Sequence, residues 1–175
     1  QSFMTKYCFD ENYGQYDNII ILDNEDDAAY GDDGSCSPTA EQLAELIDKN
    51  NTTITLETIN GRKGARITGN NGASIFVPAG GFKTAARLSS DNVAACLWSN
   101  GLTTSAARYI YNANVIRIGI TRTGISIDAR DHNGAGFVPR NYGYNIRAVK
   151  LKSDAGVDDS LTDTDAVPVK YYNAS

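Results

Sequence analysis

The segment Asp128–Gly134 ("DARDHNG") contains the only histidine of this 175-residue chain. His132 follows Asp131, and Asp128 and Asn133 add further side-chain oxygens within the same seven residues. Carboxylate and amide oxygens bind calcium, and a histidine beside a carboxylate can act as a general base. The segment could therefore bind a metal, take part in catalysis, contact a partner, or only form a turn.

The residue types in this segment argue against a metal site and against catalysis. Calcium takes roughly six to eight oxygen ligands, and Asp128, Asp131 and Asn133 supply only three side chains. A single histidine and three scattered cysteines do not form the usual structural zinc set. A Ser–His–Asp triad stays open, because its members meet in space, but no nucleophile elbow is present. We therefore expect no enzyme, no bound metal and no cofactor.

Composition limits the classes of partner. The net charge of −5 and the pI of about 4.8 argue against nucleic acid, because phosphate binding requires clustered Lys and Arg. No apolar run approaches the roughly 20 residues of a membrane span, so we expect no membrane insertion. Cys8 and Cys36 could form a disulfide, or the three cysteines could be buried thiols. The chain begins at Gln1 rather than Met, which leaves open that it is a processed or trimmed product.

Hydrophobic periodicity predicts two helices followed by short strands. One helix is expected between Asn24 and Gly31, and a second begins at Thr39 with a capping box to Gln42. After residue 52 the period changes to two, with a hairpin at Asn60-Gly61. Residues 83–106 have no clear pattern. The remaining expected strands are "RYIYNA" (108–113), "NVIRIGIT" (114–121), "GISIDA" (124–129) and "YNIRAVKL" (144–151), the last preceded by a long loop.

This order predicts an α+β protein with one domain, residues 1–152, and an acidic C-terminal tail, residues 153–175. The strands are short and mostly antiparallel, and long irregular loops connect them. The Asp-rich tail has little apolar material.

Several motifs follow one another in the order of a known family. They are "KYC.D..YG..DN", "L...DDAA", "PTA.Q..ELI", "SIFVPAGGF", "LWSN" and "YGYNIRAVK". In this order they resemble the Fibrobacter succinogenes major paralogous domain of Bacteroidetes and their phages. The resemblance runs from about Lys6 to Lys152.

The resemblance implies a C-type-lectin-like fold, which is also the fold of variable proteins made by diversity-generating retroelements. Two segments depart from the family. This chain has "DDGSCSPT" where the family has "GGSWRMPT", and "TTITLETI" where the family has "TWTWTT". Ala148 also stands where the family has Pro.

The segment between Arg108 and Arg147 is rich in Arg and Tyr, the side chains that dominate interface hot spots. We expect the structural residues to be Trp98, Tyr144 and Arg147. The candidate ligand-binding residues are Arg117, Arg122, Asp128, Arg130, Asp131, His132, Asn133, Asn141 and Tyr142.

These observations favour a non-enzymatic binding module, displayed outside the cell, on the cell surface or on a virion. Its expected ligand is a glycan or a protein on a cell surface, bound on the loop-rich face. The alternative is a structural assembly subunit, such as a capsid decoration, fibre or pilus component, that docks through its termini. A homo-oligomer or a larger assembly is open under both hypotheses.

Overall fold

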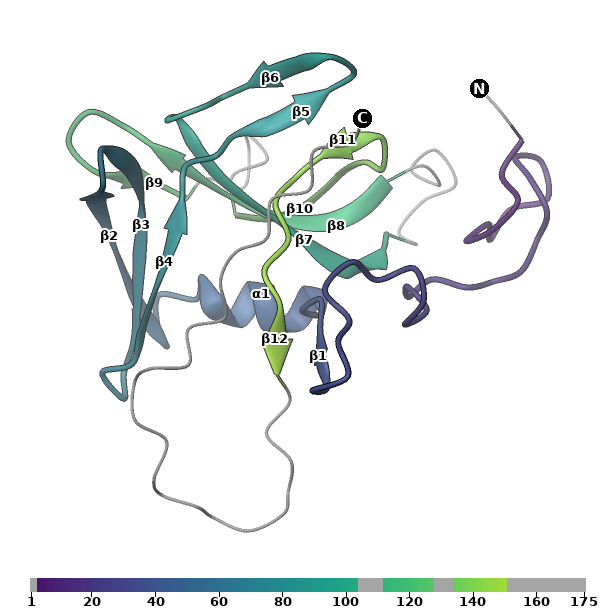
Figure 1. Cartoon of the computed structure of the whole chain (residues 1–175), viewed down its shortest axis with the longest axis horizontal. Coiled ribbons are helices and arrows are strands. Elements are labelled where there is room, and N and C mark those ends of the chain that lie inside the picture. The colour runs from purple at the N-terminus through teal and green to yellow at the C-terminus, as the bar shows by residue number, and fades with distance from the viewer. Residues whose placement is uncertain (1–2, 104–111, 128–133, 151–175) are drawn as a thin grey trace, which may run out of the picture.

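The computed structural model describes residues 3–103, 112–127 and 134–150 of the chain. In this part of the chain, strands form four small antiparallel sheets around one short helix (Figure 1). The strands are consistent with the abundance of Thr, Ile, Val and Tyr, which favour extended backbone.

The largest sheet lies at the centre and separates two hydrophobic cores. Its order is β10 (Gly134–Pro139), β8 (Asn112–Ile120) and β7 (Ala94–Leu102), and β9 (Ile125–Ser126) also pairs with β8. Side chains of a strand alternate between its two faces. On β8, Ile116 and Ile118 therefore belong to one core and Val115 to the other.

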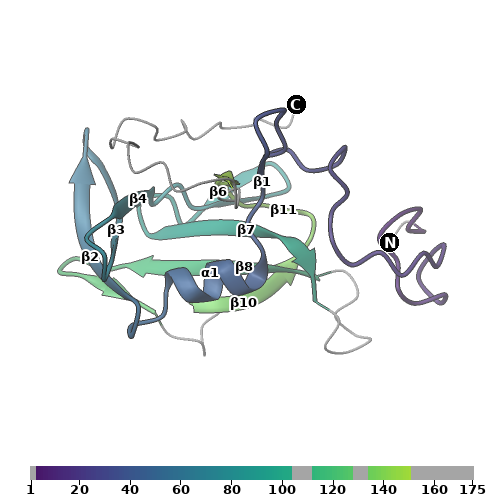
Figure 2. The same ribbon diagram turned by 90° about the horizontal axis from the view of Figure 1, so that it is seen from below.

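The first core lies between the central sheet and helix α1 (Ala40–Leu46), which extends across it (Figure 2). Leu43 and Ile47 supply the apolar stripe of the helix. The predicted capping box is confirmed. The Thr39 hydroxyl accepts from the N–H of Gln42 at 3.2 Å, and the Gln42 side chain accepts from the N–H of Thr39 at 2.9 Å.

A three-stranded meander closes the other side of this first core. It consists of β2 (Thr52–Ile59), β3 (Arg62–Gly69) and β4 (Ser74–Pro78). Asn60 and Gly61 have φ of 50° and 78°, the positive values that a two-residue hairpin turn requires. The predicted hairpin is therefore confirmed, and Ile67 and Val77 contribute its buried side chains.

The second core lies on the opposite face of the central sheet. A small sheet covers it, formed by β5 (Phe82–Thr84), β6 (Arg87–Ser89) and β11 (Tyr142–Gly143). Phe82, Tyr142 and Tyr144 pack there against Cys96 and Val115. The remaining pair, β1 (Ser35–Cys36) with β12 (Val149–Lys150), joins the two ends of the described body.

Residues 3–27 form an N-terminal arm that lies beside one end of the central sheet, at the right of Figures 1 and 2. The arm contains turns and isolated bridges instead of helices or longer strands. Residues 28–34 connect it to β1 and are called the connecting segment below.

The predicted two-helix α+β fold of the C-type-lectin-like type is wrong, because the described chain is mostly β with one short helix. The helix expected between Asn24 and Gly31 is a series of turns. Its Asp27 carboxylate accepts the N–H of Ala29 at 2.9 Å, a local bond that competes with helical pairing. The segment also lacks the apolar stripe that would fix a helix against the core.

Three further predictions about strands need correction. Residues 83–106, expected to be irregular, contain most of β5 and all of β6 and the central strand β7. The long loop before the last motif contains β10. The motif "YNIRAVKL" is not one strand, because Asn145 forms an isolated bridge with Leu97 before β12 begins at Val149. The tail, residues 153–175, lies outside the described residues.

Two expectations from composition can be compared with the structure. The three cysteines form no disulfide, and Cys8 and Cys96 are buried. In the described ranges, no helix is long and apolar enough to cross a membrane.

Candidate ligand-binding site

The structure describes only some of the residues predicted to bind a ligand. Those outside the described residues are Asp128, Arg130, Asp131, His132 and Asn133. Arg122 is exposed in the turn between β8 and β9, and Asn141 is exposed in the turn between β10 and β11. Arg117 is partly buried, with its guanidinium 5.7 Å from the ring centre of Phe82 and its Nη2 3.4 Å from the Ser90 hydroxyl.

The exposed candidates lie at opposite ends of the central sheet. Pro139 pairs with Asn112 at the start of β8, so Asn141 lies beyond this end. Arg122 follows the other end of β8, eight residue steps away, or about 26 Å at roughly 3.3 Å per residue. The structure therefore does not bring Arg122 and Asn141 into one site.

Tyr142 instead belongs to a row of four aromatic rings. Its ring stacks on Phe82 with centroids 5.6 Å apart and an interplanar angle of 11°. Phe82 lies 5.1 Å from Tyr144, and Tyr144 lies 5.2 Å from Trp98. Trp98 and Tyr144, both predicted to be structural, contact each other in this row. The packed rings extend from Tyr142 on β11 to Trp98 on β7, and Trp98 lines a cavity.

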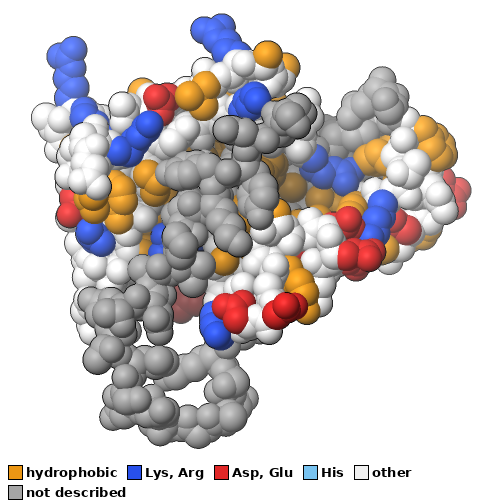
Figure 3. Space-filling model, viewed as in Figure 1, with side chains coloured by type: hydrophobic (Ala, Val, Ile, Leu, Met, Phe, Trp, Pro, Cys, Tyr) orange, Lys and Arg blue, Asp and Glu red, His pale blue; other side chains and the backbone are white. Residues whose placement is uncertain are grey.

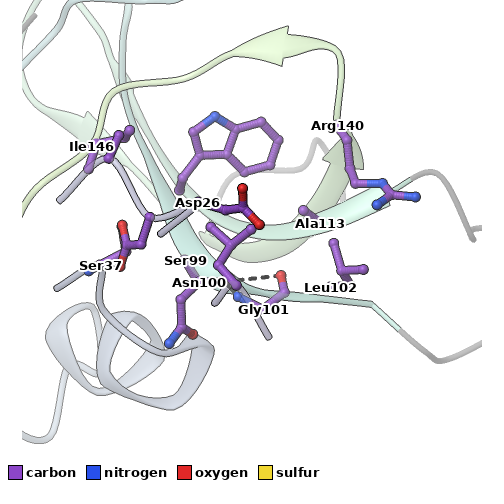
Figure 4. Close-up of a pocket in the computed structure, with 13 residues that line it drawn as sticks. Asp26, Ser37, Ser99, Asn100, Gly101, Leu102, Ala113, Arg140 and Ile146 are labelled. Atoms are coloured by element: carbon purple, nitrogen blue, oxygen red, sulfur yellow. Dashed lines mark hydrogen bonds between the residues drawn. The ribbon is translucent and has the colours of Figure 1, made fainter. Parts of the chain in front are cut away.

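This cavity, the Trp98 pocket, has a volume of about 180 Å³. Trp98, Asp26 and Arg140 line it, and Asp26 and Arg140 reach it from different sides (Figure 4). The other lining residues are Leu22, Asp27, Ala28, Ser37, Ser99, Asn100, Gly101, Leu102, Ala113 and Ile146. The arm and its connecting segment, β7, β8 and the segments that follow β1, β10 and β11 thus meet there.

A bulge in β7 creates the space for the pocket. Trp98 pairs with Val115 and Leu102 pairs with Ala113, so three residues of β7 lie opposite one residue of β8. The residues of the bulge, Ser99–Gly101, form a turn in which the N–H of Gly101 donates a hydrogen bond to the Ser99 hydroxyl at 3.1 Å. Bulges that bend a strand often lie next to functional sites.

The arm supplies the acidic side of the pocket. The Asp26 carboxylate accepts from the Lys6 ammonium at 2.6 Å and from the Tyr7 hydroxyl. These two hydrogen bonds, Lys6 first, hold the pKa of Asp26 below its ordinary value, so it is charged near neutral pH. The Asp27 carboxylate is buried and accepts from the backbone and hydroxyl of Ser37.

The described residues contain one group of carboxylates close enough to share a metal ion. Ligand atoms of Asp23, Glu25 and Asp26 lie within 4.8 Å of one another. The Lys6 ammonium lies 2.9, 3.3 and 2.6 Å from these three carboxylates. These bonds, the one to Asp26 first, raise the pKa of Lys6. Because a lysine ammonium already lies against all three carboxylates, the group is an ion-pair cluster within the arm.

The pocket is suited to binding. It offers an aromatic wall, aliphatic side chains and a charged carboxylate, the mixture typical of small-ligand sites. Two of its hydroxyls already have structural partners, since Ser37 donates to Asp27 at 2.6 Å and Ser99 accepts from Gly101. Arg147, predicted to be structural, is partly buried outside the lining, and burial lowers its pKa.

No family model, curated protein or solved structure matches this chain. The assignment of the site therefore depends on its geometry alone. Trp98 was predicted to be structural, and neither Asp26 nor Asn100 was among the predicted ligand-binding residues. The available signal was "WSNG" at 98–101, an aromatic residue followed by small polar residues and Gly, a composition typical of a bulge.

Proposed function

We propose that this protein is a non-enzymatic binding module that holds one ring-sized group of a glycan or protein ligand in the Trp98 pocket. The observation that carries the proposal is that Trp98 and the charged Asp26 carboxylate line the same pocket. A flat aromatic face packs against the apolar face of a sugar or a side chain. A carboxylate accepts hydrogen bonds from hydroxyl or N–H groups at the edge of that ligand.

The size of the pocket supports insertion of a single group. Its volume is about 180 Å³. Pockets that enclose a whole drug-sized ligand start at about 300 Å³. The remainder of the ligand would therefore lie outside, against surface residues such as Asn141. We propose that the module is displayed outside the cell, on the cell surface or on a virion.

Trp98 permits a direct test, because it is the only tryptophan of the chain. We propose to titrate the protein with a panel of oligosaccharides and peptides while recording tryptophan fluorescence. A ligand that enters the pocket changes the emission of Trp98 in a saturable way. Replacement of the exposed wall residue Ala28 (Ala28→Phe) fills the pocket without removing a hydrogen-bonding side chain and should weaken binding at least tenfold.

Ala86→Phe is the matched control, since Ala86 is exposed in the turn between β5 and β6, away from the pocket lining. It should bind like the unmodified protein. A panel without any saturable response, or equal affinity in Ala28→Phe, would contradict the proposal.

A second function, that of an assembly subunit docking through its N-terminus, is favoured by a different observation. The described chain has seven exposed large hydrophobic residues, and five of them lie in the arm and connecting segment. Figure 3 shows hydrophobic side chains at the surface of the arm, at the right of the view. Exposed apolar groups gathered in one segment mark an interaction surface.

A further inference from the structure

A second cavity, called the Asn114 hollow below, lies at the same end of the central sheet as the Trp98 pocket. Its volume is about 390 Å³, so it is larger than the Trp98 pocket and within the usual size range of small-molecule sites. Four parts of the chain line it: the arm, the first turn of α1, the bulge of β7, and β8. The lining includes Ile20, Ile21, Glu41, Asn100, Gly101 and Asn114.

The Asn114 hollow and the Trp98 pocket lie on opposite faces of the central sheet. Ala113 lines the pocket and Asn114 lines the hollow, and consecutive side chains of a strand point to opposite faces. The bulge of β7 lies between the two cavities, because Asn100, Gly101 and Leu102 line both of them. The hollow is therefore a separate site, and its occupancy does not depend on the function proposed for the pocket.

The side-chain amide of Asn100 has no hydrogen-bond partner among the described residues. Only its backbone is bonded, since its N–H donates to the carbonyl of Pro38 and its carbonyl accepts from the N–H of Leu22, both at 2.8 Å. In Figure 4 the side chain of Asn100 extends toward α1, away from Asp26 and Arg140. An Asn amide has two N–H donors and one carbonyl acceptor. The bulge therefore presents an unused donor and an unused acceptor to the hollow.

The side chain of Asn114 is held in a fixed orientation beside this amide. Its Nδ2 donates to the carbonyl of Leu102 at 3.0 Å, which leaves its Oδ1 to accept a hydrogen bond from a ligand. Gly101 has no side chain, and a Cβ added there would have the Nδ2 of Asn114 as its nearest atom, at 3.5 Å. The glycine therefore leaves space beside the Asn114 amide.

Apolar and acidic side chains complete the lining. Ile20 and Ile21 are 38% and 55% exposed, so a ligand can still cover them. Glu41 is the only charged residue among the described residues of the lining. Hydrogen bonds from its own backbone N–H and from the Thr39 hydroxyl hold the pKa of Glu41 below its ordinary value. Its carboxylate is therefore ionised near neutral pH and accepts hydrogen bonds.

We propose that the Asn114 hollow binds one uncharged sugar ring. A sugar ring has an apolar C–H face, which matches Ile20 and Ile21. Its edge carries hydroxyl groups that donate and accept, which match the two amides of Asn100 and Asn114 and the Glu41 carboxylate. Because four of these five side chains are uncharged, the lining favours a neutral ligand over a cation. The protein would then have a second ligand site, on the face opposite to the Trp98 pocket.

Nuclear magnetic resonance tests this site with sugars as the probes. Isotope-labelled protein is titrated with the common neutral hexoses and N-acetylhexosamines, and separately with tetramethylammonium chloride as the cationic probe. We expect saturable shifts of the side-chain amide signals of Asn100 and Asn114 with at least one sugar. The proposal is wrong if none of these sugars shifts them, or if only the cation does.

Gly101→Val fills the hollow without removing any of its polar side chains. The backbone at Gly101 does not have a positive φ, and the added side chain would be built toward Asn114. The variant should weaken sugar binding at the hollow at least tenfold. Ala28→Phe is the matched control, because Ala28 lines the Trp98 pocket and not the hollow. If sugar binding were lost in Ala28→Phe and kept in Gly101→Val, the sugar would belong to the Trp98 pocket and the proposal would be wrong.

Asn100→Ala is a second variant, which removes no hydrogen bond of the described chain. Loss of one hydrogen bond to the sugar should lower the affinity by up to about tenfold. The thermal midpoint of unfolding should stay that of the unmodified protein, which separates a contact with the ligand from a structural role. Unchanged affinity in both Asn100→Ala and Gly101→Val would overturn the proposal, whatever the fluorescence titration of the Trp98 pocket shows.

Discussion

Asp27 and Ser37 form the most buried polar contact between the N-terminal arm and the body. The Asp27 carboxylate accepts the backbone N–H of Ser37 at 2.7 Å and its hydroxyl at 2.6 Å. Both residues are less than a tenth exposed, at 9% and 3%. Water does not easily replace these buried hydrogen bonds. The contact therefore fixes the position of the arm, which includes the acidic residues that line the pocket.

Replacement of Asp27 should loosen the arm. In Asp27→Ala, the N–H and hydroxyl of Ser37 are left buried without their acceptor, which costs about 1–3 kcal/mol. Guanidinium unfolding should show this loss in the free energy of unfolding, and amide exchange should rise in residues 3–27. The control is Asp32→Ala at an exposed position of the connecting segment, which should stay within about 0.5 kcal/mol of the unmodified protein. Equal stability of the two variants would contradict this role.

Trp98 should contribute to stability as well as to the pocket. Its ring packs on Tyr144 at 5.2 Å, so Trp98→Ala removes the end of the aromatic row. We expect a loss of about 3 kcal/mol, the lower end of the range for large aromatic residues, because Trp98 is only partly buried. Unfolding is followed by circular dichroism. Leu88→Ala, at a side chain that is 56% exposed, should change little. If Trp98→Ala and Leu88→Ala lowered the free energy of unfolding equally, the packing role of Trp98 would be wrong.

Acid should release the arm before it unfolds the body. Burial alone would raise the pKa of Asp17, but backbone N–H groups of Ile19, Cys8 and Tyr7 bond its carboxylate, and the net pKa is lowered from 3.8. A lowered pKa in the folded state means stabilisation that is present above the ordinary value and lost as the pH falls through the folded value. Amide exchange of residues 3–22 should therefore increase below about pH 4.

Asp17→Asn provides the comparison, because it removes the titrating group. Its arm should exchange rapidly at neutral pH and show a weaker dependence on acid. If the amides of the arm and of the body lost their protection from exchange at the same pH, the arm would have no separate response to acid.

The buried thiol of Cys96 should be unreactive in the folded protein. Burial raises its pKa to about 12, although the charge of Arg117 and a hydrogen bond with Tyr144 act in the opposite direction. Thiolate is the reactive form, so a thiol reagent at pH 8 should modify Cys96 only after unfolding. Cys36 is partly exposed and should react first. Peptide mapping identifies the modified residue, and rapid labelling of Cys96 in folded protein would contradict the prediction.

Glycine is required at position 81 for two reasons. Its φ is +63°, and an added Cβ would lie 2.2 Å from the carbonyl oxygen of Ser89. Gly81→Ala should therefore destabilise the junction between β4 and β5 by more than the roughly 1–2 kcal/mol of the backbone strain alone. Gly124→Ala is the matched control, since nothing lies within 4 Å of the added atom and its φ is not positive. Thermal unfolding should separate the two variants, and equal midpoints would contradict the argument.

Local signals in the sequence predicted several elements correctly. The capping box of Thr39 and Gln42, the Asn60-Gly61 turn and the alternation in β8 each depend on residues close together in the chain. The helix expected near Asn24 shows the limit of such signals. Its acidic residues fit the first turn of a helix, but in the structure Asp27 bonds Ser37, ten residues away, and this contact outweighs a weak helical preference.

The candidate site was harder to predict. Arg122 and Asn141 were both predicted to bind the ligand, yet they lie at opposite ends of the central sheet. Trp98 was predicted to be structural, and its ring packs on Tyr144. The same side chain also lines a cavity, because the bulge at Ser99–Gly101 interrupts the pairing of β7 with β8.

The sequence by itself determined the turns, the helix cap, the faces of the strands and the absence of a long apolar span. These features depend on side-chain chemistry and on spacings of two to four residues. Only the tertiary structure decided that Asp26, Trp98 and Arg140, up to 114 positions apart, surround one pocket. The physical reason is that long-range pairing of the arm with the bulge of β7 sets these distances, and pairing across such separations leaves no periodic pattern in the sequence.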